Sequence, residues 1–272
     1  MADRQLPGRQ SLRRSLLVTP GDNGTLLEKL RESEADVAVI EVEDGVHPAR
    51  KEVARSVSAA ALRNRHWRQK ETVVRINLPN SPDGARDISS IVPSQPSAIL
   101  IPRAESVEDI GLTAELVRRS ERDSGLALDS VKIWIQVETT VGIMALARMT
   151  LADRRVDGIV LGCGDLSADL RVKRIGLGAF RRTSLDAHEL LISRSHVVAV
   201  SRAAGIDCFD SGPTHLRDMD LLAERAENSA RMGFSGVLVI SPRHVAVVNR
   251  ALSPTPNDDD LGTTIVLEEN YP

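Results

Sequence analysis

Two carboxylates in this 272-residue sequence are spaced so that they could share one metal ion. Glu138 and Asp165 each follow a short apolar run, Lys132–Val137 and Gly158–Leu161, that has the character of a buried strand. If these runs are neighbouring parallel strands, their carboxyl ends meet and both side chains can face one ion. Two carboxylates completed by water and a chelating substrate suit octahedral Mg²⁺ or Mn²⁺. The alternative is that both residues are N-caps of the helices that follow.

Arg75 is a cation that could face such an ion across the mouth of the fold. It lies in another apolar run, Val73–Ile76. An inward arginine is unfavourable unless it meets anions, and its planar fork matches a carboxylate. Substrate recognition and a structural ion pair with Glu43 or Asp44 both fit this position, and one guanidinium can serve both. We predict substrate recognition as its main role.

Eight short apolar runs, separated by helical segments, supply the elements that position these residues. Their apolarity is continuous rather than alternating, which indicates strands buried on both faces. Eight alternating strand and helix units predict a single-domain TIM (β/α)₈ barrel, in which catalytic residues lie where strands end. A doubly wound open sheet is the competing fold, but Pro20–Gly24 lacks its glycine-rich phosphate fingerprint. The runs are Ser15–Val18, Val37–Glu41, Val73–Ile76, Ala98–Ile101, Lys132–Val137, Gly158–Leu161, Asp207–Phe209 and Gly236–Ile240.

Helical character is clearest in several of the segments between the runs. Ser106 is predicted to cap one of them, because an acidic first turn follows it. Gly205 and Gly233 stand where a helix C-cap needs a left-handed residue. The segments are 49–63, 106–122, 193–204 and 221–232.

The composition excludes several classes of protein. A net charge of −3 and an aromatic content of 2% argue against a nucleic-acid binder, which would carry clustered basic residues or stacking platforms. The 2 cysteines cannot form a disulfide framework, which fits a reducing cytoplasm. No apolar run approaches the ~20 residues that cross a bilayer, and the polar start is not a signal peptide. We expect a cytoplasmic protein that binds neither nucleic acid nor membrane.

One catalytic domain accounts for most of the chain. We predict a mobile N-terminal arm over residues 1–13, the barrel over 14–252 and a short, irregular, acidic tail over 253–272. The insert 168–183 is rich in Arg and Gly, and it is expected to form a loop or lid beside the sixth strand. A hydrophobic content of 42% suffices for one large core of this kind.

Taken in order, the short motifs of this chain resemble the citrate lyase β-subunit-like branch of the HpcH/HpaI aldolase family. The resemblance covers roughly residues 14–254. Each motif is short, and the set in sequence order is what makes the resemblance specific. The motifs are 14–22 (RSLLVTPGD), 41–46 (EVEDGV), 74–77 (VRIN), 135–142 (IQVETTVG), 162–166 (GCGDL) and a late segment from 193 to 213.

The resemblance implies a TIM barrel, often a homotrimer or hexamer, with Mg²⁺ on Glu138 and Asp165. It also implies that Arg75 grips the carboxylate and oxo group of a 2-oxo acid. Members of the family typically cleave or form 3-hydroxyacyl thioesters, such as citryl or malyl derivatives of coenzyme A or a carrier protein. We therefore expect a Mg²⁺-dependent carbon–carbon lyase in which Asp44 is the first choice as proton relay and Glu43 the second. The residues expected to bind substrate are Arg75, Pro20, Gly21, Gly164 and Asp165.

Four departures from the family pattern concern the substrate pocket and the contact between subunits. Glu41 replaces an Asp, Arg103 a Lys and Ser241 a His, and the C-terminal extension is short and acidic. Asp44 stands where the pyruvate-aldolase branch has its histidine base. Two alternative functions are therefore kept: a pyruvate-type aldolase acting on free acids, and a catalytically altered binding or scaffold protein in a biosynthetic pathway.

Overall fold

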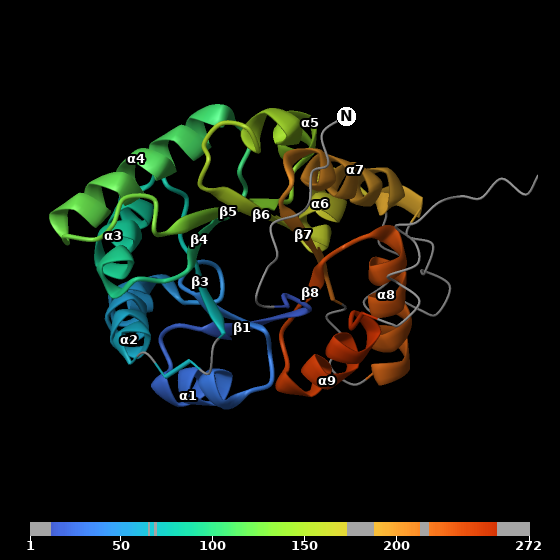
Figure 1. Ribbon diagram of the computed structural model, residues 1–272, viewed down its shortest axis with the longest axis horizontal. Coiled ribbons are helices and arrows are strands. Elements are labelled where there is room, and N and C mark those ends of the chain that lie inside the picture. The colour runs from blue at the N-terminus through green and yellow to red at the C-terminus, as the bar shows by residue number, and fades with distance from the viewer. Residues whose placement is uncertain (1–11, 65, 68–69, 173–187, 213–217, 255–272) are drawn as a thin grey trace, which may run out of the picture.

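The computed structural model is a closed barrel of parallel strands that follow one another in sequence order from β1 to β8. Figure 1 shows the strands at the centre with the helices around them. The closed sheet confirms the predicted (β/α)₈ barrel and excludes the open sheet. The structure describes residues 12–64, 66–67, 70–172, 188–212 and 218–254. The strands are β1 Ser15–Pro20, β2 Val37–Glu41, β3 Glu71–Arg75, β4 Ala98–Ile101, β5 Lys132–Val137, β6 Val156–Leu161, β7 Asp207–Ser211 and β8 Gly236–Val239.

Helices cover the outside of the barrel, and their ends follow the signals in the sequence (Figure 1). Ser106 forms a capping box with Asp109 at the start of α4. Gly205 and Gly233, which follow α7 and α8, have left-handed φ angles of 71° and 96°. The helices are α1 Gly24–Glu32, η1 Pro48–Arg50, α2 Lys51–Arg63, α3 Pro82–Ile91, η2 Val92–Ser94, α4 Val107–Asp123, α5 Thr140–Met149, α6 Cys163–Asp169, α7 His188–Ala204, α8 Met219–Met232 and α9 Pro242–Ala251.

The inside of the barrel is filled by an apolar layer. Trp134 of β5 and Phe209 of β7 are fully buried, and their rings stack with centroids 4.6 Å apart. Because side chains alternate along a strand, an inward Trp134 also directs Gln136 inward, and an inward Val73 directs Arg75 inward. The layer consists of Leu16, Val37, Val39, Val73, Ala98, Leu100, Trp134, Val160 and Phe209.

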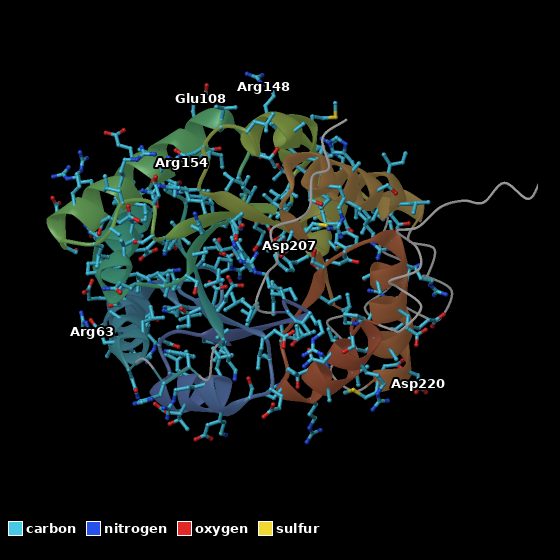
Figure 2. All side chains as sticks on the ribbon, in the orientation of Figure 1. Arg63, Glu108, Arg148, Arg154, Asp207 and Asp220 are labelled. Carbon is cyan, nitrogen blue, oxygen red and sulfur yellow. The ribbon has the colours of Figure 1, made fainter. Side chains whose placement is uncertain are left out.

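Arg13 closes the end of the barrel where the strands begin. Its guanidinium pairs with Glu71 of β3, with Asp157 of β6 at 2.8 Å and with Asp207 of β7 at 3.1 Å. Figure 2 shows Asp207 near the middle of the ring of helices, whereas the other labelled charged residues lie toward its periphery. The three carboxylates at this end share one guanidinium within the fold, and the opposite end of the barrel is the mouth, where the strands end.

Three of the expected segments lie largely outside the described residues. Leu12 and Arg13 are described from the arm, residues 168–172 from the insert, and residues 253–254 from the tail. The described part of the insert completes α6 and the turn after it. Within the described residues, no helix combines the length and apolarity needed to cross a bilayer.

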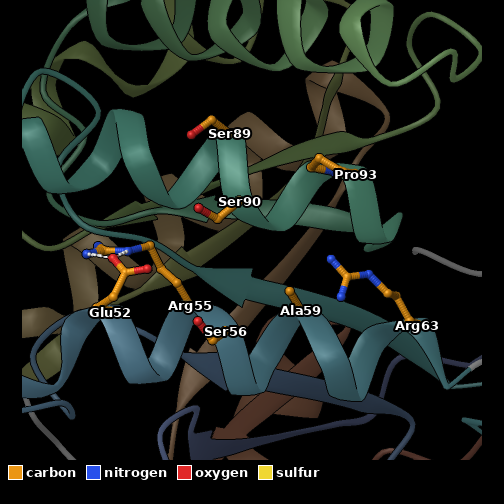
Figure 3. Close-up of a pocket in the computed structure, with 8 residues that line it drawn as sticks. All are labelled: Glu52, Arg55, Ser56, Ala59, Arg63, Ser89, Ser90 and Pro93. Atoms are coloured by element: carbon orange, nitrogen blue, oxygen red, sulfur yellow. Dashed lines mark hydrogen bonds and ion pairs between the residues drawn. The ribbon is translucent and has the colours of Figure 1, made fainter.

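A groove of 380 Å³ runs along the outer wall between α2 and α3 (Figure 3). Arg55 pairs with Glu52 at one end of it, 2.9 Å apart, and Arg63 lies at the other end. The lining comes from the helices and not from the ends of strands, so this groove is separate from the barrel mouth. The lining residues are Glu52, Arg55, Ser56, Ala59, Arg63, Ser89, Ser90 and Pro93.

A fully buried ion pair joins α4 to the strand region beside it. Arg155, just before β6, contacts the Glu121 carboxylate at 2.6 and 2.9 Å, and both side chains are 0% exposed. The same guanidinium donates to the Val131 carbonyl at 2.9 Å and lies 2.8 Å from Asp129. Without the Arg155 guanidinium, the buried Glu121 carboxylate would lose the positive charge that offsets the cost of its burial.

We predict that Arg155→Met lowers the free energy of unfolding by about 3–5 kcal/mol, because it leaves the Glu121 charge buried without its ion-pair partner. The matched control is Arg154→Met, since Arg154 also pairs with Asp129 but is 82% exposed; this change should cost less than about 1 kcal/mol. Urea denaturation measures both. Equal losses in the two variants would contradict the assignment.

Candidate active site

Glu138 lies at the carboxyl end of β5 and continues its inward-facing side. It is 2% exposed. The side-chain amide of Gln136 donates to one carboxylate oxygen at 2.5 Å, and the backbone N–H of Arg103 donates to the other at 3.0 Å. The N-cap of α5 is Thr139, whose hydroxyl accepts a backbone N–H of the helix. Glu138 is therefore not the helix cap, and its carboxylate faces the barrel mouth.

Asp165 lies in the first turn of α6, just beyond the neighbouring strand β6, and is exposed. Val137 of β5 pairs with Leu161 of β6, which brings Glu138 beside Gly162. A Cβ atom on Gly162 would stand 2.5 Å from Oε2 of Glu138. The carboxylate thus lies against this glycine, on the side where α6 begins. Because Gly162 itself is the N-cap of α6, Asp165 is not a cap either.

The electrostatics of this pair favour a bound cation. Burial, together with the charge of Asp165, raises the pKa of Glu138 to about 7, against hydrogen bonds from Gln136 and Arg103 that lower it. Asp165 is thus close enough for its charge to oppose ionisation of Glu138, and a cation between the two would relieve the repulsion. Their oxygen donors suit a hard divalent ion. In the described residues no group of three or more His, Cys, Asp or Glu side chains is arranged to hold a metal, so water and substrate would complete this site.

Arg75 ends β3 with its guanidinium directed into the same mouth. It contacts the Glu41 carboxylate through Nε and Nη2, and its Nε lies 3.6 Å from Glu43. Its Nη1 donates to the side-chain oxygen of Gln136 at 3.3 Å. Burial raises the pKa of both glutamates, while Arg75 lowers it. Glu43 and Asp44 were the two structural partners expected for Arg75. The structure shows the contact with Glu43, whereas Asp44 pairs with Arg103. The main partner of Arg75 is Glu41.

Gln136 is a site residue that the sequence reasoning missed. Its amide oxygen accepts from Arg75 and its amide nitrogen donates to Glu138, so the two contacts fix the orientation of the group. The side chain is 5% exposed. The spacing of Trp134, Gln136 and Glu138 was the available signal, because residues two apart on a strand share a face. Gln136 thereby links the arginine to the carboxylate of the candidate metal site.

Asp44 and Glu43, the two candidates for proton relay, lie in different surroundings. Asp44 is on the rim with its side chain 63% exposed, and it accepts a hydrogen bond from Nη2 of Arg103 at 2.9 Å. Glu43 is 6% exposed and lies beside Arg75. Asp44 is therefore accessible to a substrate, whereas Glu43 belongs to the ion-pair cluster.

The acidic segment after β2 is held by one lysine and one side-chain amide. Lys51 donates to the carbonyl oxygens of Val42 at 3.0 Å and Glu43 at 2.6 Å, and the Asn77 amide donates to Val42 at 3.0 Å. Gly45 makes room for the longer acid at position 41, since a Cβ there would lie 2.7 Å from Cγ of Glu41. The Glu that replaces the family's Asp is accommodated by this close approach.

The remaining predicted positions lie at three strand ends. Pro20 ends β1, but the Gly21 N–H donates to the Glu41 carbonyl at 2.8 Å. That N–H already has a backbone partner, so a substrate anion would have to bind to other groups of this loop. Gly164 is exposed in the first turn of α6, and a Cβ there would meet no atom within 4 Å. Ser241, in place of a family histidine, is the N-cap of α9.

Comparison with known proteins gives a consistent result along the chain. The family described as HpcH/HpaI aldolase/citrate lyase matches residues 14–242. The citrate lyase subunit beta of Haemophilus influenzae is 29% identical over 255 residues, which are 94% of this chain and 84% of that protein. The mitochondrial citramalyl-CoA lyase of Rattus norvegicus is 29% identical over 255 residues, covering 90% of this chain and 72% of its own length.

Solved structures show the same similarity in three dimensions. The citrate lyase beta subunit of Mycobacterium tuberculosis, complexed with oxaloacetate and magnesium, superposes with a TM-score of 0.72 at 26% identity. The match covers 90% of this chain and 98% of that one. The structural similarity therefore extends over nearly the whole chain.

We predict that metal binding weakens as the pH falls through 7. The pKa of Glu138 is about 7 without metal, so below that pH the ion must displace a proton, and above it the carboxylate is already free. Mn²⁺ affinity should be about tenfold weaker at pH 6 than at pH 8, with close to one proton released per ion at pH 6. Calorimetry in buffers of different ionisation enthalpy measures both. An affinity independent of pH over this range would contradict the role of Glu138.

We predict that Gly162→Ala weakens Mn²⁺ binding by at least about tenfold, because the new methyl group would displace the Glu138 carboxylate. Gly164→Ala, two residues later, has open space around it and should leave Mn²⁺ affinity within about twofold. Titration of the two variants side by side tests the geometry. Similar affinities in both would show that the Glu138 position does not control metal binding.

Proposed function

The chain belongs to the HpcH/HpaI aldolase/citrate lyase family, and from this premise we propose that it is a Mg²⁺-dependent carbon–carbon lyase. Its substrate is a 3-hydroxyacyl thioester of the citryl or malyl type, carried by coenzyme A or an acyl-carrier protein. Cleavage gives a 2-oxo acid and a shorter acyl thioester, and the reverse reaction joins them. The relatives named for citrate lyase and citramalyl-CoA lyase support this reaction class.

Opposite charges lie together at one mouth of the barrel, and this arrangement supports the proposal most directly. Glu138 and Asp165 offer oxygen donors from adjoining strand ends, and Arg75 is connected to Glu138 through Gln136. A 2-oxo acid presents a carboxylate and a neighbouring oxygen, the pair of groups that a divalent ion chelates. The complex of the Mycobacterium tuberculosis relative with oxaloacetate and magnesium supports this pairing.

Glu138 and Asp165 would hold the cation, which when bound acts as a Lewis acid and lowers the pKa of the substrate hydroxyl. Asp44 accepts the hydroxyl proton. The carbon–carbon bond then breaks as the hydroxyl carbon becomes a carbonyl, and the electron pair of that bond leaves with the thioester fragment as an enolate. Return of the proton from Asp44 to the enolate carbon completes the products and restores the base. Glu43 is the second candidate for the base.

Arg75 stabilises the negative charge that develops near the carboxylate of the substrate. Its guanidinium is held on the mouth side of the buried apolar layer, where few waters compete for it. Glu41 already contacts Nε and Nη2 of Arg75. The groups that remain to bind the substrate are therefore Nη1 of Arg75 and the side-chain amide of Gln136. This division of roles lets Arg75 stay fixed while the substrate enters.

We predict that Glu138→Gln and Asp165→Asn each lower kcat by at least about hundredfold, because either change removes a charged oxygen ligand of the ion. Glu108→Gln, on the outer surface of α4 (Figure 2), is the control and should keep full activity. Turnover with Mg²⁺ is measured with citryl- and malyl-type thioesters. Full metal-dependent turnover in either site variant would refute the ligand assignment.

A substrate panel separates this function from the alternatives. We predict that the coenzyme A thioesters of malate-type and citrate-type acids are cleaved at least about a hundredfold more efficiently than the free hydroxy acids, because binding of the carrier contributes to transition-state stabilisation. A preference for free hydroxy-oxo acids would indicate a pyruvate-type aldolase. Metal and 2-oxo acid binding without turnover of any substrate would indicate a binding or scaffold protein.

The chain is proposed to act in the cytoplasm as a homotrimer or hexamer. Both cysteines, Cys163 and Cys208, are free, which suits a reducing compartment. Met144 of α5 and Ile192 of α7 are 84% and 82% exposed, and large exposed apolar side chains on adjoining helices support a subunit contact. Light scattering of the purified protein measures the assembly.

A further inference from the structure

Arg103 contacts two different parts of the mouth with two different groups. Its backbone N–H donates to Oε1 of Glu138 at 3.0 Å. Its guanidinium donates to Oδ2 of Asp44 at 2.9 Å. One residue therefore connects a carboxylate of the candidate metal site to the candidate proton acceptor, which comes from a different strand end.

The backbone of Arg103 is held in an unusual conformation. Its φ angle is 45°, in the left-handed region that side chains other than glycine seldom occupy. Such conformations persist where the surroundings demand them, and they concentrate at functional sites. Here the conformation accompanies an amide directed at Glu138 and a side chain directed at the rim.

Stability does not account for the ion pair that Arg103 makes. The Arg103 and Asp44 side chains are 44% and 63% exposed, and pairs this accessible to solvent contribute little to folding. The same exposure leaves Asp44 accessible to a substrate in the mouth. The pair is therefore suited to orienting a side chain rather than to holding the barrel together.

We propose that Arg103 is a positioning residue, which fixes Glu138 through its main chain and orients Asp44 toward the substrate through its guanidinium. This inference rests on the proposed lyase function. The arginine provides a planar, always charged donor whose reach and direction differ from those of the lysine in the family pattern. Asp44 is consequently held in a defined orientation for the proton transfer.

The test uses Arg103→Gly, which keeps the backbone N–H, permits the left-handed φ angle and removes the guanidinium. The melting temperature and Mn²⁺ affinity should stay within error and within about twofold, respectively, because the contact with Glu138 is retained. The value of kcat should fall about 10–100-fold while KM for the thioester changes less than about twofold. Arg103→Lys should recover part of the loss. Millimolar guanidinium chloride should raise kcat of Arg103→Gly and leave the wild type unchanged.

Several outcomes would overturn the inference. Wild-type kcat in Arg103→Gly would show that the guanidinium orients nothing in the reaction. A higher KM with kcat retained would make Arg103 a substrate ligand instead. A fall in Mn²⁺ affinity parallel to kcat would place the effect at the metal site. Failure of the proposed function has a different signature, since the wild type itself would then cleave none of the thioesters.

Discussion

The guanidinium of Arg75, with its side chain 20% exposed, connects the buried acidic residues at the mouth of this barrel. Arg75 contacts Glu41, Glu43 and Gln136, and Gln136 in turn holds Glu138. Burial raises the pKa of all three glutamates, and the charge of Arg75 lowers it. Without Arg75 these side chains would take up protons more readily and lose the negative charge that the chemistry needs. The order of the mouth therefore depends on the position of one arginine on β3.

The two ends of the barrel use arginine differently. At the end where strands begin, Arg13 is surrounded by three carboxylates and closes the barrel. At the mouth, Asp165 is exposed beside a carboxylate whose ionisation its charge opposes. The first arrangement is a closed structural network. The second places two carboxylates near each other with one of them open to solvent, and negative charge gathered at an open site attracts a divalent cation.

The sequence predicted the scaffold well because buried parallel strands leave a strong signal. Continuous apolar runs located every strand to within a few residues, and the placement of Glu138 and Asp165 after adjoining strands followed from them. The contacts were less predictable, because they depend on loop conformation. The backbone N–H of Arg103 donates to Glu138 because Arg103 has a left-handed φ angle. The neighbouring residues in the sequence do not predict this conformation. Likewise, Glu41 faces Arg75 because it continues the inward side of β2, whereas Asp44 lies beyond the strand.

We propose that Glu138 and Asp165 bind one hard cation across the mouth from Arg75. Anomalous diffraction from a crystal soaked with Mn²⁺ and a small 2-oxo acid tests it most directly. We expect one strong peak at about 2 Å from an oxygen of each carboxylate, with the 2-oxo acid completing the coordination. A peak elsewhere, or carboxylates too far apart to share the ion, would contradict it and leave a lyase-family barrel whose chemistry lies at other residues.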